Sequence, residues 1–167
     1  MTAAPVGAGG TTVAARLAAL GLTLPPPPPP AGAYVPAVLD GDHVWTAGQL
    51  PFVGGTLPAT GLVGADVTPE TAHDLARLCA LNALAAIAGV VDLDAVVRIV
   101  KVVGFVASAD GFTGQSQVVN GASALLADVF GDAGVHARSA VGVAALPLGT
   151  PVEVEVVARV SGRGGAA

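Results

Sequence analysis

The ionisable residues most informative about chemistry lie near the C-terminus, where one arginine precedes two glutamates. Arg138 is the one cation at the head of an otherwise apolar run, and an isolated charge in such a place needs a partner. The planar guanidinium group matches a carboxylate in two-point geometry. The partner is either the carboxylate of a bound ligand or, in a purely structural role, Glu153 or Glu155. The residues by themselves leave both interpretations open.

Other familiar chemistries find little support in the residue pattern. His43, His73 and His136 lack the spacing of metal ligands, so surface or capping roles are expected for them. The single cysteine, Cys79, has no ligand-like neighbour and excludes an internal disulfide framework. The run 121–123 (Gly-Ala-Ser) falls inside a helical pattern and is therefore no nucleophile elbow. We expect neither a metal nor a cofactor.

The composition favours a protein that buries surface between copies of itself. Of the 167 residues, 53% are hydrophobic and only 11% are charged. No stretch of about 18 residues is both apolar and free of charge, so a membrane span is not expected. A net charge of −5 without a basic patch argues against binding to nucleic acid. Because no basic segment precedes an apolar core at the N-terminus, a cytoplasmic location is the default expectation.

The chain is expected to contain one main domain with short flanking segments. Val13, Leu17 and Leu20 recur at helical spacing and predict a short helix over residues 11–22. An unbroken proline run follows and predicts an extended polyproline II lead-in. The predicted organisation is an N-terminal tail, short helix and polyproline lead-in over 1–30, a domain over 31–160, and a disordered tail over 161–167.

Within the domain, turn and capping signals separate strands from helices. Asp40-Gly41-Asp42 between two β-prone runs predicts a hairpin. Thr68, Pro69 and Glu70 have the types expected at a helix start. Residues 96–106 are rich in Val and Ile and predict a strand buried on both faces. The expected strands are 33–39, 43–47, 96–106, 138–145 and 152–160, the expected helices are 68–89 and 113–130, and 48–67 reads as a loop.

This order, β-β-α-β-α-β-β, predicts an α+β fold in which the two long helices cover one face of the sheet. The 96–106 strand also needs a cover on its other face, and no further helix of sufficient size exists unless residues 11–22 supply it. Association of copies through the open face is the simplest solution. The pattern therefore indicates an oligomer.

Four segments together resemble the YjgF/RidA family of reactive intermediate deaminases, also described as endoribonuclease L-PSP-like. They are the segment 136–157, which begins His-Ala-Arg-Ser, the segment 32–36 (Gly-Ala-Tyr-Val-Pro), the segment 46–51 (Thr-Ala-Gly-Gln-Leu-Pro) and the segment 119–122 (Val-Asn-Gly-Ala). The resemblance covers roughly residues 31–160 in the family's order. The proline-rich lead-in resembles a longer-chain bacterial branch of that family.

The resemblance implies a chorismate-mutase-like fold with a mixed sheet, and a homotrimer with clefts between its subunits. It also implies hydrolysis of enamines and imines, such as 2-aminoacrylate, to 2-keto acids and ammonia. In this scheme Arg138 holds the substrate carboxylate, and Glu153 orients water and manages protons. Tyr34 and Asn120 line the cleft, and backbone groups near Gly48 and Ala140 position the imine.

Two departures from the family pattern bear on this expectation. Ala47 stands where many members carry Ser, and Ala140 stands where many carry Cys. Loss of the Ser hydroxyl bears on specificity or rate, whereas the Cys is credited with a backbone role that Ala keeps. Three other functions stay open. One is non-catalytic binding of a small carboxylate metabolite in the same cleft. The second is an enzyme that uses the cleft for a different small carboxylate. The third is a ribonuclease, which the acidic charge disfavours.

Overall fold

The computed structural model describes residues 11–27 and 33–161. In this part of the chain the elements follow the expected order, with the short helix in front, so the α+β class and the order β-β-α-β-α-β-β are confirmed. The elements are α1 (Val13–Ala19), β1 (Ala37–Asp40), β2 (His43–Thr46), α2 (Pro69–Ala88), β3 (Val96–Ala107), α3 (Gln115–Phe130), β4 (Ala137–Val143) and β5 (Val152–Val160).

Some expectations fall on residues outside the described ranges. They concern the N-terminal tail over 1–10, the last prolines of the run at 28–30 and the C-terminal tail from 162. The division into a lead-in, a domain over 31–160 and a tail stays a prediction.

The five strands form one mixed sheet in the order β1-β2-β5-β3-β4. β3 and β4 are parallel, and the other neighbouring pairs are antiparallel. Parallel neighbours need a crossover connection, which α3 provides between β3 and β4. The predicted hairpin joins β1 to β2, where Asp40 pairs with His43 and Gly41 adopts a φ of 60°. A positive φ at this position suits glycine, since its lack of a Cβ removes the steric cost.

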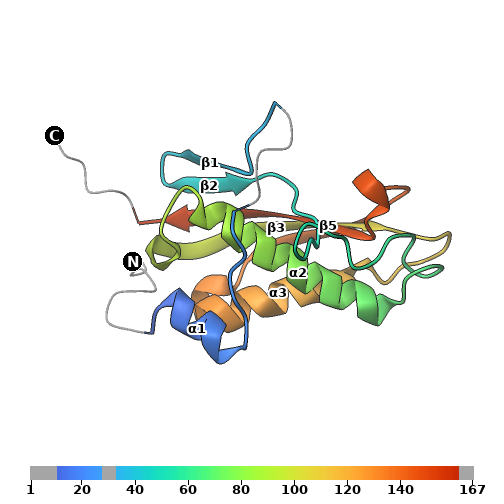
Figure 1. Cartoon of the computed structure of the whole chain (residues 1–167), viewed down its shortest axis with the longest axis horizontal. Helices are drawn as coiled ribbons and strands as arrows, with labels where there is room; N and C mark the ends of the chain where they lie inside the picture. Colours follow the sequence, from blue (N-terminus) through green and yellow to red (C-terminus); the bar gives the residue numbers. More distant parts are fainter. Residues whose placement is uncertain (1–10, 28–32, 162–167) are drawn as a thin grey trace.

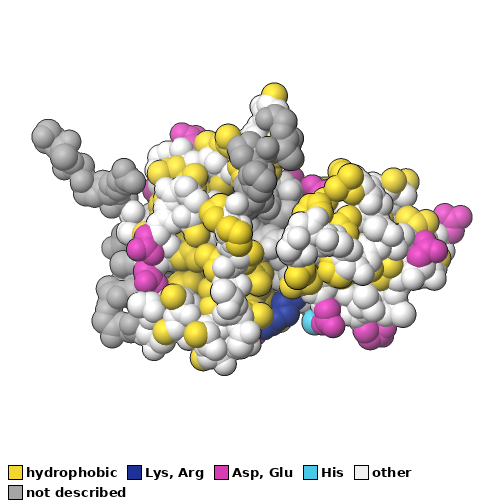
Figure 2. Space-filling model, viewed as in Figure 1, with side chains coloured by type: hydrophobic (Ala, Val, Ile, Leu, Met, Phe, Trp, Pro, Cys, Tyr) yellow, Lys and Arg dark blue, Asp and Glu magenta, His cyan; other side chains and the backbone are white. Residues whose placement is uncertain are grey.

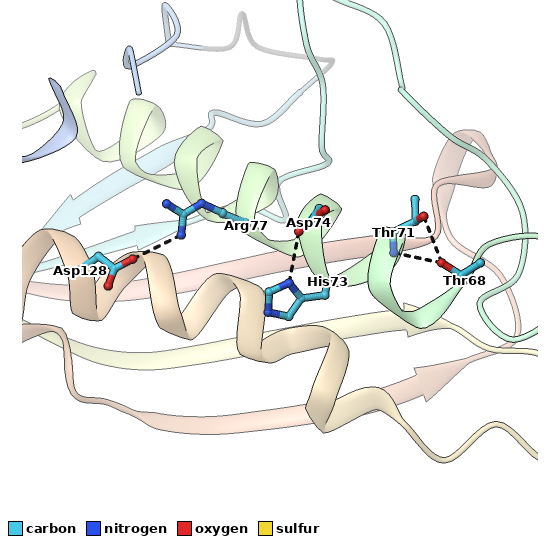
Figure 3. Close-up of polar contacts among 6 residues, drawn as sticks. All are labelled: Thr68, Thr71, His73, Asp74, Arg77 and Asp128. Atoms are coloured by element: carbon cyan, nitrogen blue, oxygen red, sulfur yellow. Dashed lines mark hydrogen bonds and ion pairs between the residues drawn. The ribbon is translucent and has the colours of Figure 1, made fainter. Parts of the chain in front are cut away.

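The helices α2 and α3 lie side by side on one face of the sheet (Figure 1). Thr68 caps α2 as predicted, because its hydroxyl accepts a hydrogen bond from the backbone N–H of Thr71 at 3.2 Å (Figure 3). Arg77 and Asp128 connect the two helices at 3.4 Å (Figure 3), but partly exposed ion pairs contribute little stability. The packing of α2 and α3 on the sheet is therefore stabilised mainly by burial of apolar side chains. The fully buried residues include Leu84, Ile87, Leu125 and Leu126.

The close contact between α2 and α3 requires glycine at position 121. A Cβ at Gly121 would overlap the backbone carbonyl of His73 in α2. Helix propensity alone predicts that Gly121→Ala stabilises the protein by about 1 kcal/mol. Because a backbone carbonyl cannot move aside cheaply, we expect the opposite sign, with a loss of about 1–3 kcal/mol. Urea unfolding measures the change in the free energy of unfolding. The control is Gln117→Ala, at an exposed position of the same helix. A Gly121→Ala protein more stable than the wild type would contradict this packing.

The second face of the sheet is open in the single chain. Along β5, Val152, Val154, Val156 and Ala158 are fully buried against the helices, while the alternate residues are partly exposed. The expectation that β3 is buried on both faces is wrong for one chain. Arg98 is exposed, and Val103 and Phe105 are only half-buried. The physical reason is that no element of the described chain covers this face.

The short helix α1 does not provide that cover. It lies beside α3 (Figure 1), where Val13 and Leu17 join the core. The backbone N–H of Val13 donates to Asp94 Oδ1 at 2.7 Å, and Arg16 Nη1 donates to the carbonyl of Val129 at 2.9 Å. Within residues 11–27 and 33–161, none of the helices has the length and apolar character needed to cross a bilayer.

Candidate functional site

Arg138 lies on β4 and points to α3. Its Nη1 donates to Asn120 Oδ1 at 2.8 Å and to Ser123 Oγ at 3.0 Å, and its Nη2 donates to the carbonyl oxygen of Ser116 at 3.2 Å. No carboxylate of the described residues lies within ion-pair distance of this guanidinium. The structural alternative, in which Arg138 pairs with Glu153 or Glu155, is therefore wrong within one chain. The charge is half-buried, held by neutral groups and uncompensated.

The register of the sheet and the pitch of α3 place these groups together. Arg138 pairs with Val102 of β3, whose side chain is fully buried against the helices, so Arg138 shares that face. On α3, Ser116, Asn120 and Ser123 are spaced by four and three residues and therefore lie on one side of the helix. We call Arg138, Asn120, Ser123 and the carbonyl of Ser116 the arginine half-site.

His136 joins this half-site, although the sequence suggested only a surface or capping role. Its Nδ1 lies 2.6 Å from the carbonyl oxygen of Gly134, and its Nε2 lies 3.0 Å from Ser123 Oγ. Burial lowers the pKa of His136, and the neighbouring Arg138 charge lowers it further, against the opposing effect of the Gly134 hydrogen bond. The ring is therefore neutral at neutral pH.

Glu153 and Gly48 form a second group, the glutamate half-site. Glu153 pairs with Phe105 and points to the open face, as its alternation with the buried Val152 and Val154 requires. A Cβ at Gly48 would overlap the Glu153 carboxylate, so this glycine provides the space for it. Burial raises the pKa of Glu153, and the negative charge of Glu155 raises it further. A carboxyl group with a raised pKa suits proton transfer near neutral pH.

The other two candidates from the sequence are Ala140 and Tyr34. Ala140 follows Arg138 by two residues on β4 and packs against the core on the same face. Tyr34 is exposed and lies two residues before Pro36, whose carbonyl accepts a hydrogen bond from the N–H of Ala47. The structure thus brings Arg138 to Asn120 and Glu153 to Gly48, and it places these two groups on opposite faces of one sheet.

Sequence reasoning missed Ser123 and His136. Ser123 was considered only as a possible nucleophile, and His136 was expected to have a surface or capping role. The signal that could have found them was relative position, because Ser123 lies three residues after Asn120 on a helix and His136 lies two residues before Arg138. No group of three or more potential metal ligands occurs in residues 11–27 and 33–161.

The fold and the half-sites define a class of protein: a mixed α+β sheet with helices on one face and an arginine presented at its edge strand. The family described as "YjgF/chorismate mutase-like, putative endoribonuclease" matches residues 14–160. The chain belongs to this family, the YjgF/RidA family, as its sequence motifs predicted.

Individual relatives agree with this assignment. Protein TCP17 of Trypanosoma cruzi is 46% identical over 149 residues, which cover 87% of this chain and 92% of that protein. Among solved structures, protein Atu1372 of Agrobacterium tumefaciens, of unknown function, has a TM-score of 0.82 and 42% identity, covering 89% of this chain and 92% of that chain. An endoribonuclease-like protein of Shewanella oneidensis has a TM-score of 0.86 and 31% identity, covering 90% and 100%.

E. coli TdcF, solved with bound serine, is a more distant neighbour. Its TM-score is 0.59 and its identity is 28%, and the match covers 80% of this chain and 93% of TdcF. These neighbours confirm the chorismate-mutase-like fold.

Proposed function

We propose that this protein hydrolyses reactive enamine or imine intermediates resembling 2-aminoacrylate, and that it releases a 2-keto acid and ammonia. The observation that carries the proposal is the half-buried guanidinium of Arg138, which three neutral hydrogen bonds hold in place and no described carboxylate neutralises. Such a group favours an anionic ligand, since a carboxylate supplies both the missing charge and two acceptor oxygens.

The residues supply the rest of the chemistry without a cofactor. The imine carbon is already electrophilic, so orientation and a proton shuttle are the main requirements. In the proposed reaction water adds to the C=N carbon while Glu153 accepts a proton from the water. Glu153 gives this proton to the nitrogen, which forms a carbinolamine. It then takes the proton of the carbinolamine hydroxyl and passes it to the nitrogen as the C–N bond breaks, which leaves C=O and ammonia. The raised pKa of Glu153 suits these proton transfers.

One small substrate cannot reach both half-sites of a single chain, because they lie on opposite faces of the sheet. The proposed active site therefore lies in a cleft between subunits of a homotrimer, where one subunit contributes Arg138 and its neighbour contributes Glu153. The open face supports this arrangement, since Trp45, Val38 and Val141 on it are 53%, 50% and 43% exposed. Exposed apolar patches of this kind mark association surfaces.

We expect Trp45→Glu to weaken the oligomer, because subunit contact would then desolvate a new carboxylate. Sedimentation velocity should show a trimer for the wild type and smaller species for the variant. Leu20→Glu is the matched control, since Leu20 is 38% exposed beside α1 and away from the open face. Unchanged mass for Trp45→Glu would place the interface elsewhere, and dissociation of both variants would show a general effect of added charge.

A second candidate function uses the same cleft. The serine bound to TdcF shows that a structural neighbour takes up a small amino acid, so this chain is a candidate for binding a small carboxylate metabolite without turning it over. A ribonuclease is less favoured, despite the family's description, because the net charge is −5. The face drawn in Figure 2 carries one small basic group among scattered acidic side chains, which offers little to a phosphate backbone.

The decisive experiment generates 2-aminoacrylate in situ with an amino-acid dehydratase and follows its decay with and without the purified protein. Faster decay with matching release of ammonia supports the deaminase. No acceleration across several imines, together with measurable binding of a 2-keto acid, would instead support the binding function. A salt-dependent affinity for RNA would revive the ribonuclease.

A further inference from the structure

We propose that Ser123 and His136 are positioning residues that orient Arg138, so that the Nε–Nη2 edge of its guanidinium faces the substrate carboxylate. The inference rests on the proposed function and extends it to two residues to which the family resemblance assigns no role. Both belong to a continuous hydrogen-bonded chain that runs from Gly134 through His136 and Ser123 to Arg138.

The direction of each hydrogen bond in this chain follows from its first member. A backbone carbonyl only accepts, so the contact with Gly134 places the ring proton of His136 on Nδ1. In the neutral ring Nε2 is then an acceptor, and the hydroxyl of Ser123 must donate to it. The lone pairs of Ser123 Oγ consequently remain to accept from Arg138 Nη1. His136 thus fixes the hydroxyl rotor of Ser123, and Ser123 fixes the guanidinium.

The guanidinium has five N–H groups, and the contacts of Arg138 leave a specific pair of them available. Both Nη1 hydrogens are used, by Asn120 Oδ1 and Ser123 Oγ, and one Nη2 hydrogen is used by the Ser116 carbonyl. Nε–H and one Nη2–H therefore have no partner among the described residues, and we infer that this free Nη2–H is the one on the Nε side. These adjacent nitrogens form one edge of the plane, and such an edge binds the two oxygens of a carboxylate. Ser123 therefore matters for carboxylate binding, because its hydroxyl oxygen accepts one of the two Nη1 hydrogens and so helps to fix the orientation of the guanidinium.

The test compares Ser123→Ala with two matched variants. Gln117→Ala is the control, because Gln117 is an exposed residue of the same helix and makes none of the hydrogen bonds to Arg138. Ser123→Thr keeps the hydroxyl and should rescue. For Ser123→Ala we expect the Kd for pyruvate, measured by calorimetry, to rise about tenfold, because a charge-assisted hydrogen bond is lost. With an imine substrate KM should rise by the same factor and kcat should stay within about threefold.

A merely structural role would give a different pattern. It would lower Tm in Ser123→Ala while the folded protein kept the wild-type Kd and KM, and that result would overturn the proposal. Nitrogen-15 spectra of the His136 ring give a readout that needs no substrate. We expect the Nδ1–H form in the wild type and a shift of the Nε2 resonance in Ser123→Ala, whereas an Nε2–H form in the wild type would overturn the proposal.

These readouts separate the two proposals. If the wild type hydrolyses no imine but Ser123→Ala weakens pyruvate binding, the deaminase fails and the positioning role stands. If the wild type hydrolyses imines and Ser123→Ala binds pyruvate as the wild type does, the positioning role fails and the deaminase stands. Failure of the wild type to bind pyruvate would overturn the positioning role as well, because the exposed edge of Arg138 would then hold no carboxylate.

Discussion

Arg138→Ala should lower kcat/KM for imine hydrolysis by a factor of about 100 to 1,000, which corresponds to the loss of a bidentate, charge-assisted carboxylate contact of about 3–4 kcal/mol. Most of the loss should appear in KM, because the carboxylate is bound in the ground state and in the transition state alike. Steady-state kinetics on the folded oligomer, with ammonia release as the readout, measures the effect. Arg138→Lys should recover only part of it, since lysine keeps the charge but not the fork.

Arg98→Ala is the matched control for this prediction. Arg98 is an exposed arginine on the neighbouring strand β3, and its removal subtracts the same charge without touching the arginine half-site. We expect its kcat/KM to stay within about threefold of the wild type, in line with the small effect of an exposed charge. Equal losses in both variants would indicate long-range electrostatics, and wild-type kinetics in Arg138→Ala would exclude this residue as the carboxylate site.

Glu153→Gln should lower kcat by a factor of about 100 to 10,000, the range typical for the loss of a general acid–base group, and should leave KM nearly unchanged. The amide has almost the shape of the carboxyl group, so it fits the space that Gly48 provides. It cannot accept a proton from water at neutral pH. Single-turnover measurement of imine decay separates this chemical step from substrate binding.

The same substitution should not cost stability at neutral pH. Burial and Glu155 raise the pKa of Glu153 in the folded state, so ionising this group opposes folding. The penalty is absent below the unfolded-state pKa and reaches its full size as pH rises through the folded-state pKa. Glu153→Gln removes it, and we expect unfolding at pH 7 to need as much urea as the wild type or more.

Glu155→Gln is the control for both properties of Glu153. Glu155 lies two residues away on the same face of β5 and contributes to the raised pKa of Glu153. Its removal should keep kcat within about threefold and move the ionisation of Glu153 to lower pH. A loss of kcat as large as that of Glu153→Gln would show that the negative charge of this face, and not Glu153 itself, supports the reaction.

Much of the fold was predictable from local patterns, because those patterns report interactions along a single segment. The Asp40-Gly41 turn, the Thr68 cap and the alternation along 152–160 each depend on neighbours a few residues away, and all three appear in the structure. The composition signalled an uncovered face, since more apolar surface was present than two helices can bury. The strand at 96–106 was wrongly expected to be buried on both sides, because apolar residues facing a partner surface look the same in sequence as core residues.

The sequence by itself determined the family and named the residues of the candidate site, since Arg138, Asn120 and Glu153 stand in motifs whose order is readable along the chain. Only the tertiary structure decided how these residues combine. The parallel register of β3 and β4 turns Arg138 to the helices, and the alternation of β5 turns Glu153 to the open face. The chain from His136 through Ser123 also exists only after α3 packs beside β4. Contacts of this kind join segments that are distant along the chain, and no local spacing encodes the distance between them.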